Sequence, residues 1–151
     1  MSVRHVGVQE AQRLQMEDGY TYIDVRSVPE YGNGHPEGAH NVPLLHLNSE
    51  TRQMQPNPEF LAVMQANYPS DAKLLIGCQV GGRSSRAAQV LAGAGYETVV
   101  NVKGGFGGYR DPATGQVLDE GWASAGLPVE TGGSDEVGYT ALQQKANTSG
   151  D

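Results

Sequence analysis

The only cysteine of the chain, Cys78, stands in a loop whose residues favour a reactive sulfur. A short aliphatic run at 73–76 precedes it, and glycines at 81 and 82 and then Arg83 follow it. Glycine amides and the start of a helix can converge on one point and stabilise an anion there. A free thiol with a pKa of about 8.5 is only about 3% ionised at pH 7, so such a loop would make the sulfur a far better nucleophile. These residue types indicate covalent catalysis through a thiolate.

The bland alternative for a lone cysteine is a small, buried apolar residue. A core cysteine needs neither two adjacent glycines nor an arginine around it, so the composition of the loop favours the reactive interpretation. The residues on either side indicate the local structure: the run at 73–76 is typical of a buried parallel strand, and apolar residues recur at helix spacing from 87 to 94. The cysteine is therefore predicted to lie in a strand-to-helix turn.

The rest of the chain alternates between strand and helix patterns. We predict strands at 3–8, 20–25, 39–42 and 98–102, and helices at 9–17 and 58–67. With the strand at 73–76, this order predicts an open α/β sheet. Parallel strands joined by right-handed crossovers leave a crevice at their carboxyl ends, where the cysteine loop emerges.

Several motifs in order resemble one known family. They are Ile23-Asp24-Val25-Arg26, the segment from Glu30 through Gly34-His35-Pro36 to Pro43, Ala92-Gly93-Ala94-Gly95-Tyr96, Val99-Val100-Asn101-Val102-Lys103-Gly104-Gly105-Phe106, and Ala125-Gly126-Leu127-Pro128-Val129-Glu130. Together with the cysteine loop they resemble the rhodanese domain family, specifically its small single-domain members. The resemblance spans residues 3–130 and implies a rhodanese-like α/β fold with an open, mostly parallel five-stranded sheet and helices on both faces.

The resemblance implies a thiosulfate sulfurtransferase. Cys78 would be the catalytic nucleophile, taking sulfane sulfur from thiosulfate or a persulfide and passing it from its own persulfide to cyanide or a thiol, including a protein thiol. No metal or organic cofactor is implied. The substrate-binding positions carried over from the loop are Gln79, Val80, Gly81, Gly82, Arg83 and Ser84.

Two other functions stay open. A sulfur-relay module would receive its persulfide from another protein and carry it to a dedicated acceptor. A cysteine-dependent phosphatase or arsenate reductase would use a similar loop, but with one residue more. Four residues separate Cys78 from Arg83, which is the shorter spacing and favours a sulfur atom over a tetrahedral oxyanion.

The length and net charge of the chain limit its domain organisation, its partners and its location. The 151 residues suffice for one domain at 1–130, followed by a flexible C-terminal tail at 131–151 with a short helix pattern at 137–146. The net charge of −7 argues against nucleic acid as a partner, and we expect no membrane association and a cytoplasmic location. The segment from Cys78 to Arg110 carries a net +3, from four cations and Glu97, which would favour an anionic substrate near the site.

Other polar residues receive structural interpretations. We expect Asp24 to brace the cysteine loop through an ion pair with Arg86. His35, His40 and His46 are expected to serve turns and the surface rather than a metal. An inserted segment at 110–121 is rich in turn residues and predicts a hairpin near the site. The glycines around Phe106 are expected to let chain segments approach the site closely, with Phe106 or Tyr109 at its rim.

Overall fold

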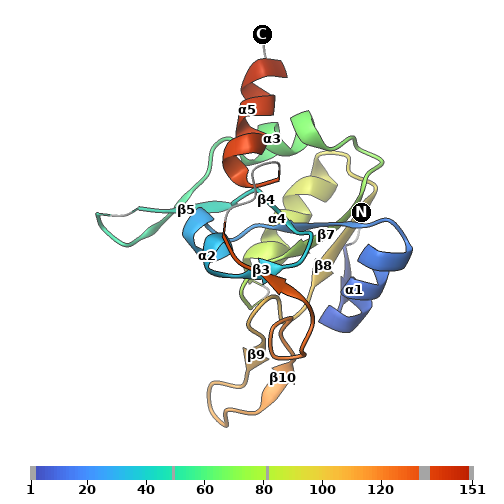
Figure 1. The fold of residues 1–151 in the computed structure, drawn as a ribbon, viewed down its shortest axis with the longest axis vertical. Helices are drawn as coiled ribbons and strands as arrows, with labels where there is room; N and C mark the ends of the chain where they lie inside the picture. Colours follow the sequence, from blue (N-terminus) through green and yellow to red (C-terminus); the bar gives the residue numbers. More distant parts are fainter. Residues whose placement is uncertain (1–2, 49, 81, 133–136, 150–151) are drawn as a thin grey trace.

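A parallel sheet forms the centre of the molecule in the computed structural model, which describes residues 3–48, 50–80, 82–132 and 137–149 (Figure 1). Its five strands lie in the order β1 (Arg4–Val6), β8 (Thr98–Val102), β7 (Lys73–Gly77), β2 (Thr21–Asp24) and β4 (His40–Asn41). All four neighbouring pairs are parallel. The predicted five-stranded α/β sheet is therefore confirmed, and the cysteine follows its middle strand.

The middle strand is apolar because both of its faces are covered. Leu74, Leu75 and Ile76 are fully buried, and Leu75 belongs to a different apolar cluster from its two neighbours. Side chains alternate between the faces of a strand, so a strand covered on both sides needs a continuous apolar run. This is why an aliphatic run without polar alternation, at 73–76, forms the centre of the sheet.

Helices cover both faces, as predicted. One face carries α3 (Phe60–Asn67), α4 (Gly82–Gly93) and α5 (Tyr139–Ser149), whose buried side chains share one cluster. The other face carries α1 (Val8–Glu17), whose Val8, Ala11 and Leu14 pack in a second cluster with Trp122. None of the helices in the described ranges is long and apolar enough to cross a membrane.

A short helix and two small antiparallel strand pairs lie outside the central sheet. The helix α2 (Val28–Asn33) follows β2, and β3 (His35–Pro36) pairs with β11 (Val129–Glu130) in an antiparallel ladder. Another antiparallel pair is β5 (Leu45–Leu47) with β6 (Met54–Pro56). The sequence patterns predicted neither α2 nor these pairs, because the segments are too short for a periodic signal.

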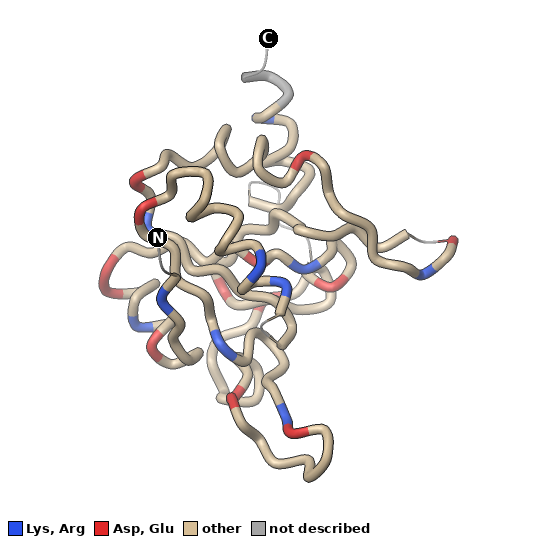
Figure 2. Tube along the Cα trace, turned by 180° about the vertical axis from the view of Figure 1, so that it is seen from behind, with Lys and Arg blue, Asp and Glu red and all other residues tan. Residues whose placement is uncertain are grey.

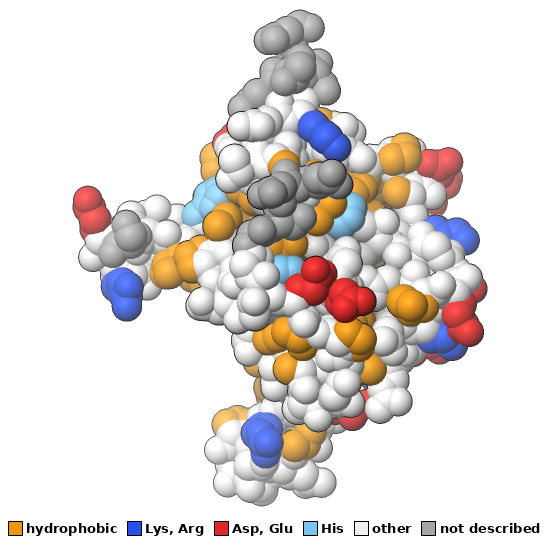
Figure 3. Space-filling view, viewed as in Figure 1, with side chains coloured by type: hydrophobic (Ala, Val, Ile, Leu, Met, Phe, Trp, Pro, Cys, Tyr) orange, Lys and Arg blue, Asp and Glu red, His pale blue; other side chains and the backbone are white. Residues whose placement is uncertain are grey.

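The hairpin predicted in the inserted segment is present. It consists of β9 (Tyr109–Arg110) and β10 (Val117–Asp119), and it projects from the body of the molecule. Apolar side chains show on its surface in the space-filling view, and Val117 and Leu118 are each about half exposed (Figure 3). This hairpin is reached through the glycine-rich segment 104–108, which contacts the cysteine loop as described below.

The C-terminal segment contains the helix expected near 137–146, as α5. Tyr139 and Leu142 on this helix are buried in the same cluster as α3, and the two helices lie side by side. The helix α5 is therefore packed against the domain, while the flexible character expected of the segment 131–151 stays a prediction. The boundary at residue 130 stays a prediction.

Candidate active site

Cys78 lies directly beyond β7, at the carboxyl end of the sheet, with a residue exposure of 2%. The next described helix, α4, begins at Gly82, which confirms the strand-to-helix turn. The thiol donates a hydrogen bond to Ser84 Oγ at 3.4 Å, and Ser84 is itself fully buried in the first turn of α4. The sulfur therefore has a hydroxyl group as an immediate neighbour.

The glycine-rich segment after β8 lies against the cysteine loop. The amide of Phe106 donates to the carbonyl of Cys78 at 2.7 Å, and the amide of Gly107 donates to the carbonyl of Gln79 at 2.9 Å. A Cβ at Gly105 would lie 2.2 Å from the Cys78 carbonyl oxygen, and one at Gly107 would lie 2.1 Å from Gln79 Nε2. At Gly105 the atom met is backbone and only glycine permits this approach, whereas at Gly107 it is the end of the flexible Gln79 side chain. The close approach predicted for these glycines is confirmed.

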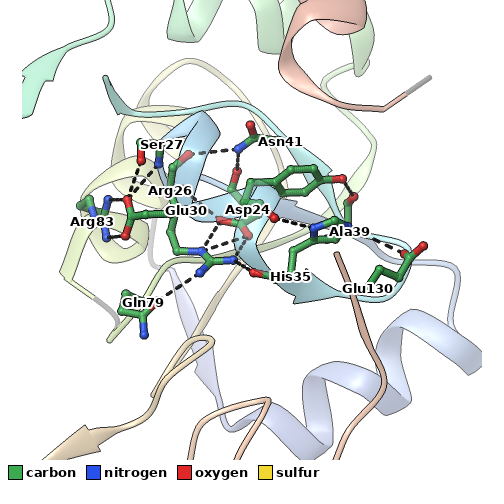
Figure 4. Close-up of polar contacts among 12 residues, drawn as sticks. Asp24, Arg26, Ser27, Glu30, His35, Ala39, Asn41, Gln79, Arg83 and Glu130 are labelled. Carbon is green, nitrogen blue, oxygen red and sulfur yellow. Dashed lines mark hydrogen bonds and ion pairs between the residues drawn. The ribbon is translucent and has the colours of Figure 1, made fainter. Parts of the chain in front are cut away.

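Arg83 is bound to a carboxylate at the site. Its Nη1 and Nη2 donate to the two oxygens of Glu30, at 2.7 and 2.9 Å (Figure 4). Glu30 also accepts from the amide and hydroxyl of Ser27, completing a capping box at the start of α2. Burial acts to raise the pKa of Glu30, but these hydrogen bonds outweigh it and lower the pKa from 4.5 to about 2. The carboxylate is therefore charged and clamps α4 to α2.

The brace expected between Asp24 and Arg86 is wrong. Asp24 instead binds Arg26, two residues further on, through both carboxylate oxygens (2.7–3.1 Å), and Arg86 is exposed on α4. Arg26 is 3% exposed and also donates to the carbonyl of Gly34 at 2.6 Å. A turn after β2 folds the arginine back over the aspartate, which an argument from element spacing does not anticipate. The buried pair occupies the end of the sheet beside the cysteine loop.

Arg26 connects this ion pair to the cysteine loop and to a pocket. Its Nη1 donates to Gln79 Oε1 at 3.1 Å, and its guanidinium carbon lies 4.5 Å from the centroid of the Phe106 ring. A pocket of about 230 Å³ opens here. Its lining residues are Arg26, Glu30, Asn33, Gly34, Gln79 and Phe106. Of the two residues expected at the rim of the site, Phe106 lines this pocket beside the cysteine loop and Tyr109 does not.

Two positions of the cysteine loop remain, Val80 and Gly81. Val80 is 48% exposed at the loop tip, whereas Gly81 lies outside the described residues. The convergence of the loop amides on the sulfur therefore stays a prediction. As a group, the structure brings Cys78, Gln79, Arg83 and Ser84 to the carboxyl end of the sheet.

Charge at the site is more balanced than the positive loop segment suggests. The two guanidinium groups at the site, Arg26 and Arg83, each contact a carboxylate. Acidic and basic positions are spread over the whole trace (Figure 2). Any attraction of an anion therefore depends on individual N–H groups rather than on a broad positive field.

The three histidines of the candidate metal set face different tyrosines. His35 stacks on Tyr31, while the other two, His40 and His46, contact Tyr68 and Tyr139. Burial lowers the pKa of His40, whose Nδ1 lies 2.6 Å from the Tyr68 hydroxyl. Within the described ranges, no group of three or more His, Cys, Asp or Glu side chains could hold a metal ion.

Three residues of this site were not assigned to it by sequence reasoning: Arg26, Glu30 and Asn101. Asn101 on β8 accepts a hydrogen bond from the Ser84 hydroxyl at 2.6 Å. A signal for Glu30 was available, because a serine three residues before a glutamate is typical of a capped helix start. The pairing of that glutamate with Arg83 depends on the tertiary fold.

Comparison with known proteins identifies the class to which this fold and site belong. A family model described as "Rhodanese-like domain" matches residues 7–111. The chain belongs to this family. The resemblance seen in the motifs is thereby confirmed, and the fold described above is a rhodanese-like fold.

Individual relatives are more specific in their names. The chain is 33% identical to "Rhodanese-like domain-containing protein 14, chloroplastic" of Arabidopsis thaliana, over 85% of this chain and 66% of that protein. It is 34% identical to "Thiosulfate sulfurtransferase 16, chloroplastic" of the same plant, over 74% of this chain and 81% of that protein. The crystal structure of Rv0390 from M. tuberculosis matches with a TM-score of 0.70 and 26% identity, over 87% of this chain and all of that chain.

Proposed function

We propose that this protein is a sulfurtransferase that moves sulfane sulfur from thiosulfate to cyanide or a thiol through a persulfide on Cys78. The observation that carries the proposal is the place of this cysteine, at the carboxyl end of the middle parallel strand and beside the Ser84 hydroxyl. Open α/β sheets bind their ligands at this end of the strands. Relatives named thiosulfate sulfurtransferase support the choice of donor.

The reaction has two displacement steps. In the first, the Cys78 thiolate attacks the outer sulfur of thiosulfate; an S–S bond forms to the cysteine, and the bond to the sulfonate sulfur breaks, releasing sulfite with the electron pair. In the second, cyanide or a thiolate attacks the outer sulfur of the persulfide and leaves with it as thiocyanate or as a new persulfide, restoring the cysteine thiolate. No external oxidant or reductant is required, and the kinetics are ping-pong.

Hydrogen-bond donors near the sulfur serve both steps. The outer persulfide sulfur carries negative charge, and donors already aimed at it lower its energy without reorganisation. The loop from Gln79 to Ser84 supplies backbone amides and the Ser84 hydroxyl for this purpose. A guanidinium carries five N–H groups, of which Glu30 engages two on Arg83, so the same arginine can also donate to the sulfonate oxygens of the donor.

The pocket beside the loop is the place we propose for the acceptor. It is bounded by Gln79 of the cysteine loop and by Arg26, whose buried guanidinium is held by Asp24. Its volume of about 230 Å³ suits a small anion or the end of a thiol side chain. The pocket therefore accommodates both kinds of acceptor, cyanide and a low-molecular-weight or protein thiol.

The length of the loop favours sulfur over phosphate chemistry. Four residues stand between Cys78 and Arg83, whereas the related phosphatases and arsenate reductases carry one more. A wider loop would be needed to surround a tetrahedral oxyanion bonded to the cysteine sulfur. Cleavage of a phosphoester by this protein would contradict this part of the proposal.

Steady-state transfer from thiosulfate to cyanide tests the proposal directly. Thiocyanate formation is expected with the wild-type chain and should be abolished in Cys78→Ser. Mass spectrometry after thiosulfate treatment should find one added sulfur atom on Cys78, removable by cyanide. Loading only by a persulfidated protein would instead identify a sulfur-relay module.

The cytoplasmic location stays a prediction; several relatives are named chloroplastic or mitochondrial.

A further inference from the structure

A row of hydrogen-bonded side chains connects the sulfur of Cys78 with the edge of the sheet. The thiol donates to Ser84 Oγ at 3.4 Å, and the Ser84 hydroxyl donates to Asn101 Oδ1 at 2.6 Å. Asn101 Nδ2 then lies 3.0 Å from His5 Nδ1. The first three residues are buried, whereas His5 is exposed on β1. The row therefore links the proposed nucleophile to an imidazole in contact with solvent.

Sheet register places these side chains together. Asn101 on β8 is the partner of His5 on one side and of Ile76 on the other. Partners in a parallel ladder project from the same face, and here that face is covered by α4. The first turn of α4 brings Ser84 over the end of the sheet, between Asn101 and the cysteine that follows β7.

The amide of Asn101 differs from that of another buried asparagine in its partners. Asn41 uses its Nδ2 to bind two backbone carbonyls, those of Asp24 and Arg26, and so braces a turn. Asn101 is 4% exposed, and its amide oxygen and nitrogen each bind a side chain, those of Ser84 and His5. Burying an amide has a free-energy cost that a valine at this position would avoid. Its partners indicate a role in orienting Ser84 rather than in holding the backbone.

We propose that Asn101 is a positioning residue that aims the Ser84 hydroxyl at Cys78, and that its amide couples the ionisation of Cys78 to the proton on Nδ1 of His5. The inference rests on the proposed function, in which this cysteine reacts as a thiolate. It adds two residues, Asn101 and His5, that lie outside the cysteine loop.

In the thiol form, every hydrogen bond of the row points away from the sulfur. The S–H donates to Ser84, the serine O–H donates to the oxygen of Asn101, and the amide N–H donates to His5. The imidazole then accepts with Nδ1, so it is neutral and carries its proton on Nε2.

In the thiolate form, the direction of the row must reverse, because a thiolate can only accept. The Ser84 hydroxyl turns to donate to the sulfur, and its oxygen then accepts from Nδ2 of Asn101 after a half-turn of the amide. The amide oxygen now faces His5, which carries a proton on Nδ1 either as the neutral Nδ1–H tautomer or as the imidazolium; the imidazolium cannot accept from the amide N–H and so fits only this direction of the row. The cysteine proton leaves to solvent and none passes through the amide; His5 takes its Nδ1 proton from solvent. A protonated His5 therefore favours the thiolate.

Other charged groups around the row do not titrate in the same range. Arg83 and Arg86 lie on α4, Arg4 lies beside His5 on β1, and Lys103 follows β8. Asp24 at the end of β2 binds Arg26 in the turn that follows, and on β2 burial raises the pKa of Tyr22 well above its usual range. Arginine and lysine stay cationic from about pH 5 to pH 9. A deviation of cysteine reactivity from a single ionisation therefore reports on His5 if it disappears when the imidazole is removed.

Alkylation of Cys78 by iodoacetamide across this pH range tests the coupling. As the pH falls, wild-type rates should decrease less steeply than a single ionisation requires, because a protonated His5 supports the remaining thiolate. Asn101→Leu should restore a single-ionisation curve and slow alkylation at pH 7 by about three- to tenfold, because the amide N–H no longer holds the Ser84 hydroxyl toward the thiolate. His5→Phe should remove the deviation. Asn67→Leu and His46→Gln serve as matched controls and should retain the wild-type curve.

Two outcomes would overturn the inference: a wild-type profile that follows a single ionisation, or an unchanged profile in the folded Asn101→Leu or His5→Phe variant. His5 is exposed, so its variant keeps the test available if Asn101→Leu does not fold. The proposed function fails separately. If thiosulfate leaves Cys78 unmodified while the alkylation profile behaves as expected, transfer from thiosulfate is refuted and the row remains. Normal loading by thiosulfate with a wild-type profile that follows a single ionisation refutes the row alone.

Discussion

Arg83 and Glu30 meet through two parallel hydrogen bonds that join the first turn of α4 to α2. The two residues are 53 positions apart in the chain, and both border the cysteine loop or its pocket. A bidentate arginine–carboxylate contact fixes the plane of the guanidinium as well as its position. The contact therefore fixes the orientation of the arginine that follows the cysteine loop.

Removal of this carboxylate should weaken both activity and stability. Glu30→Gln keeps the shape of the side chain but loses the charge, and we expect a loss of about 1–2 kcal/mol in the free energy of unfolding at pH 7. Transfer from thiosulfate should show a raised KM, because Arg83 is less well oriented. Urea unfolding and steady-state kinetics measure the two effects. Glu10→Gln breaks an exposed ion pair with Arg13 and should change stability by less than about 0.5 kcal/mol.

The same carboxylate predicts a pH dependence of stability. The pKa of Glu30 is lowered from 4.5 to about 2 in the folded protein, so its contribution is fully present above pH 4.5 and is lost as the pH falls toward 2. The difference in unfolding free energy between wild type and Glu30→Gln should therefore shrink over this interval. A difference that stays constant from pH 6 to pH 2.5 would contradict the assigned ion pair.

Close approach at Gly105 should make a methyl group intolerable there. Gly105→Ala places a Cβ 2.2 Å from the Cys78 carbonyl oxygen, in addition to the strain of a positive φ of 56°. We expect a loss of about 3 kcal/mol or more and little sulfur transfer. Gly115→Ala, at a φ of 75° with nothing within 4 Å of the new Cβ, isolates the backbone strain and should cost about 1 kcal/mol. Equal melting temperatures for the two variants would refute the contact.

Substitution of Asp24 should lower the free energy of unfolding more than it lowers the rate of sulfur transfer. Asp24→Ala leaves the guanidinium of Arg26 buried without its carboxylate, which we expect to cost about 3–5 kcal/mol. A melting curve beside the sulfur-transfer assay separates the two effects; activity at low temperature should persist in the folded fraction. Arg86→Ala tests the pairing that the structure rejects and should leave the melting temperature nearly unchanged.

Packing of the C-terminal helix can be tested on Leu142. This side chain is 2% exposed in the core cluster, so Leu142→Ala should lower the free energy of unfolding by about 2–4 kcal/mol. Thr140→Ala on the exposed side of the same helix is the control and should have little effect. A negligible cost at Leu142 would instead show that α5 contributes nothing to the domain.

The features that could be predicted from the sequence are those that depend on local patterns. An aliphatic run followed by a cysteine, glycines and a helix pattern defined the turn at Cys78, because strand and helix periodicity and glycine content act within a few residues. Motifs in order indicated the family and with it the five-stranded sheet. The hairpin at 109–119 was also visible, since its turn residues are local signals.

Tertiary structure alone decided which side chains meet. The pairing of Arg83 with Glu30, of Asp24 with Arg26 rather than Arg86, and of Asn101 with Ser84 depends on strand order, register and the angle at which α4 leaves the sheet. These quantities follow from the packing of both apolar clusters at once. The sequence position of a residue indicates the helix or strand to which it belongs and often the face of that element on which it lies. Which distant residue its side chain contacts depends on the packing of the whole domain.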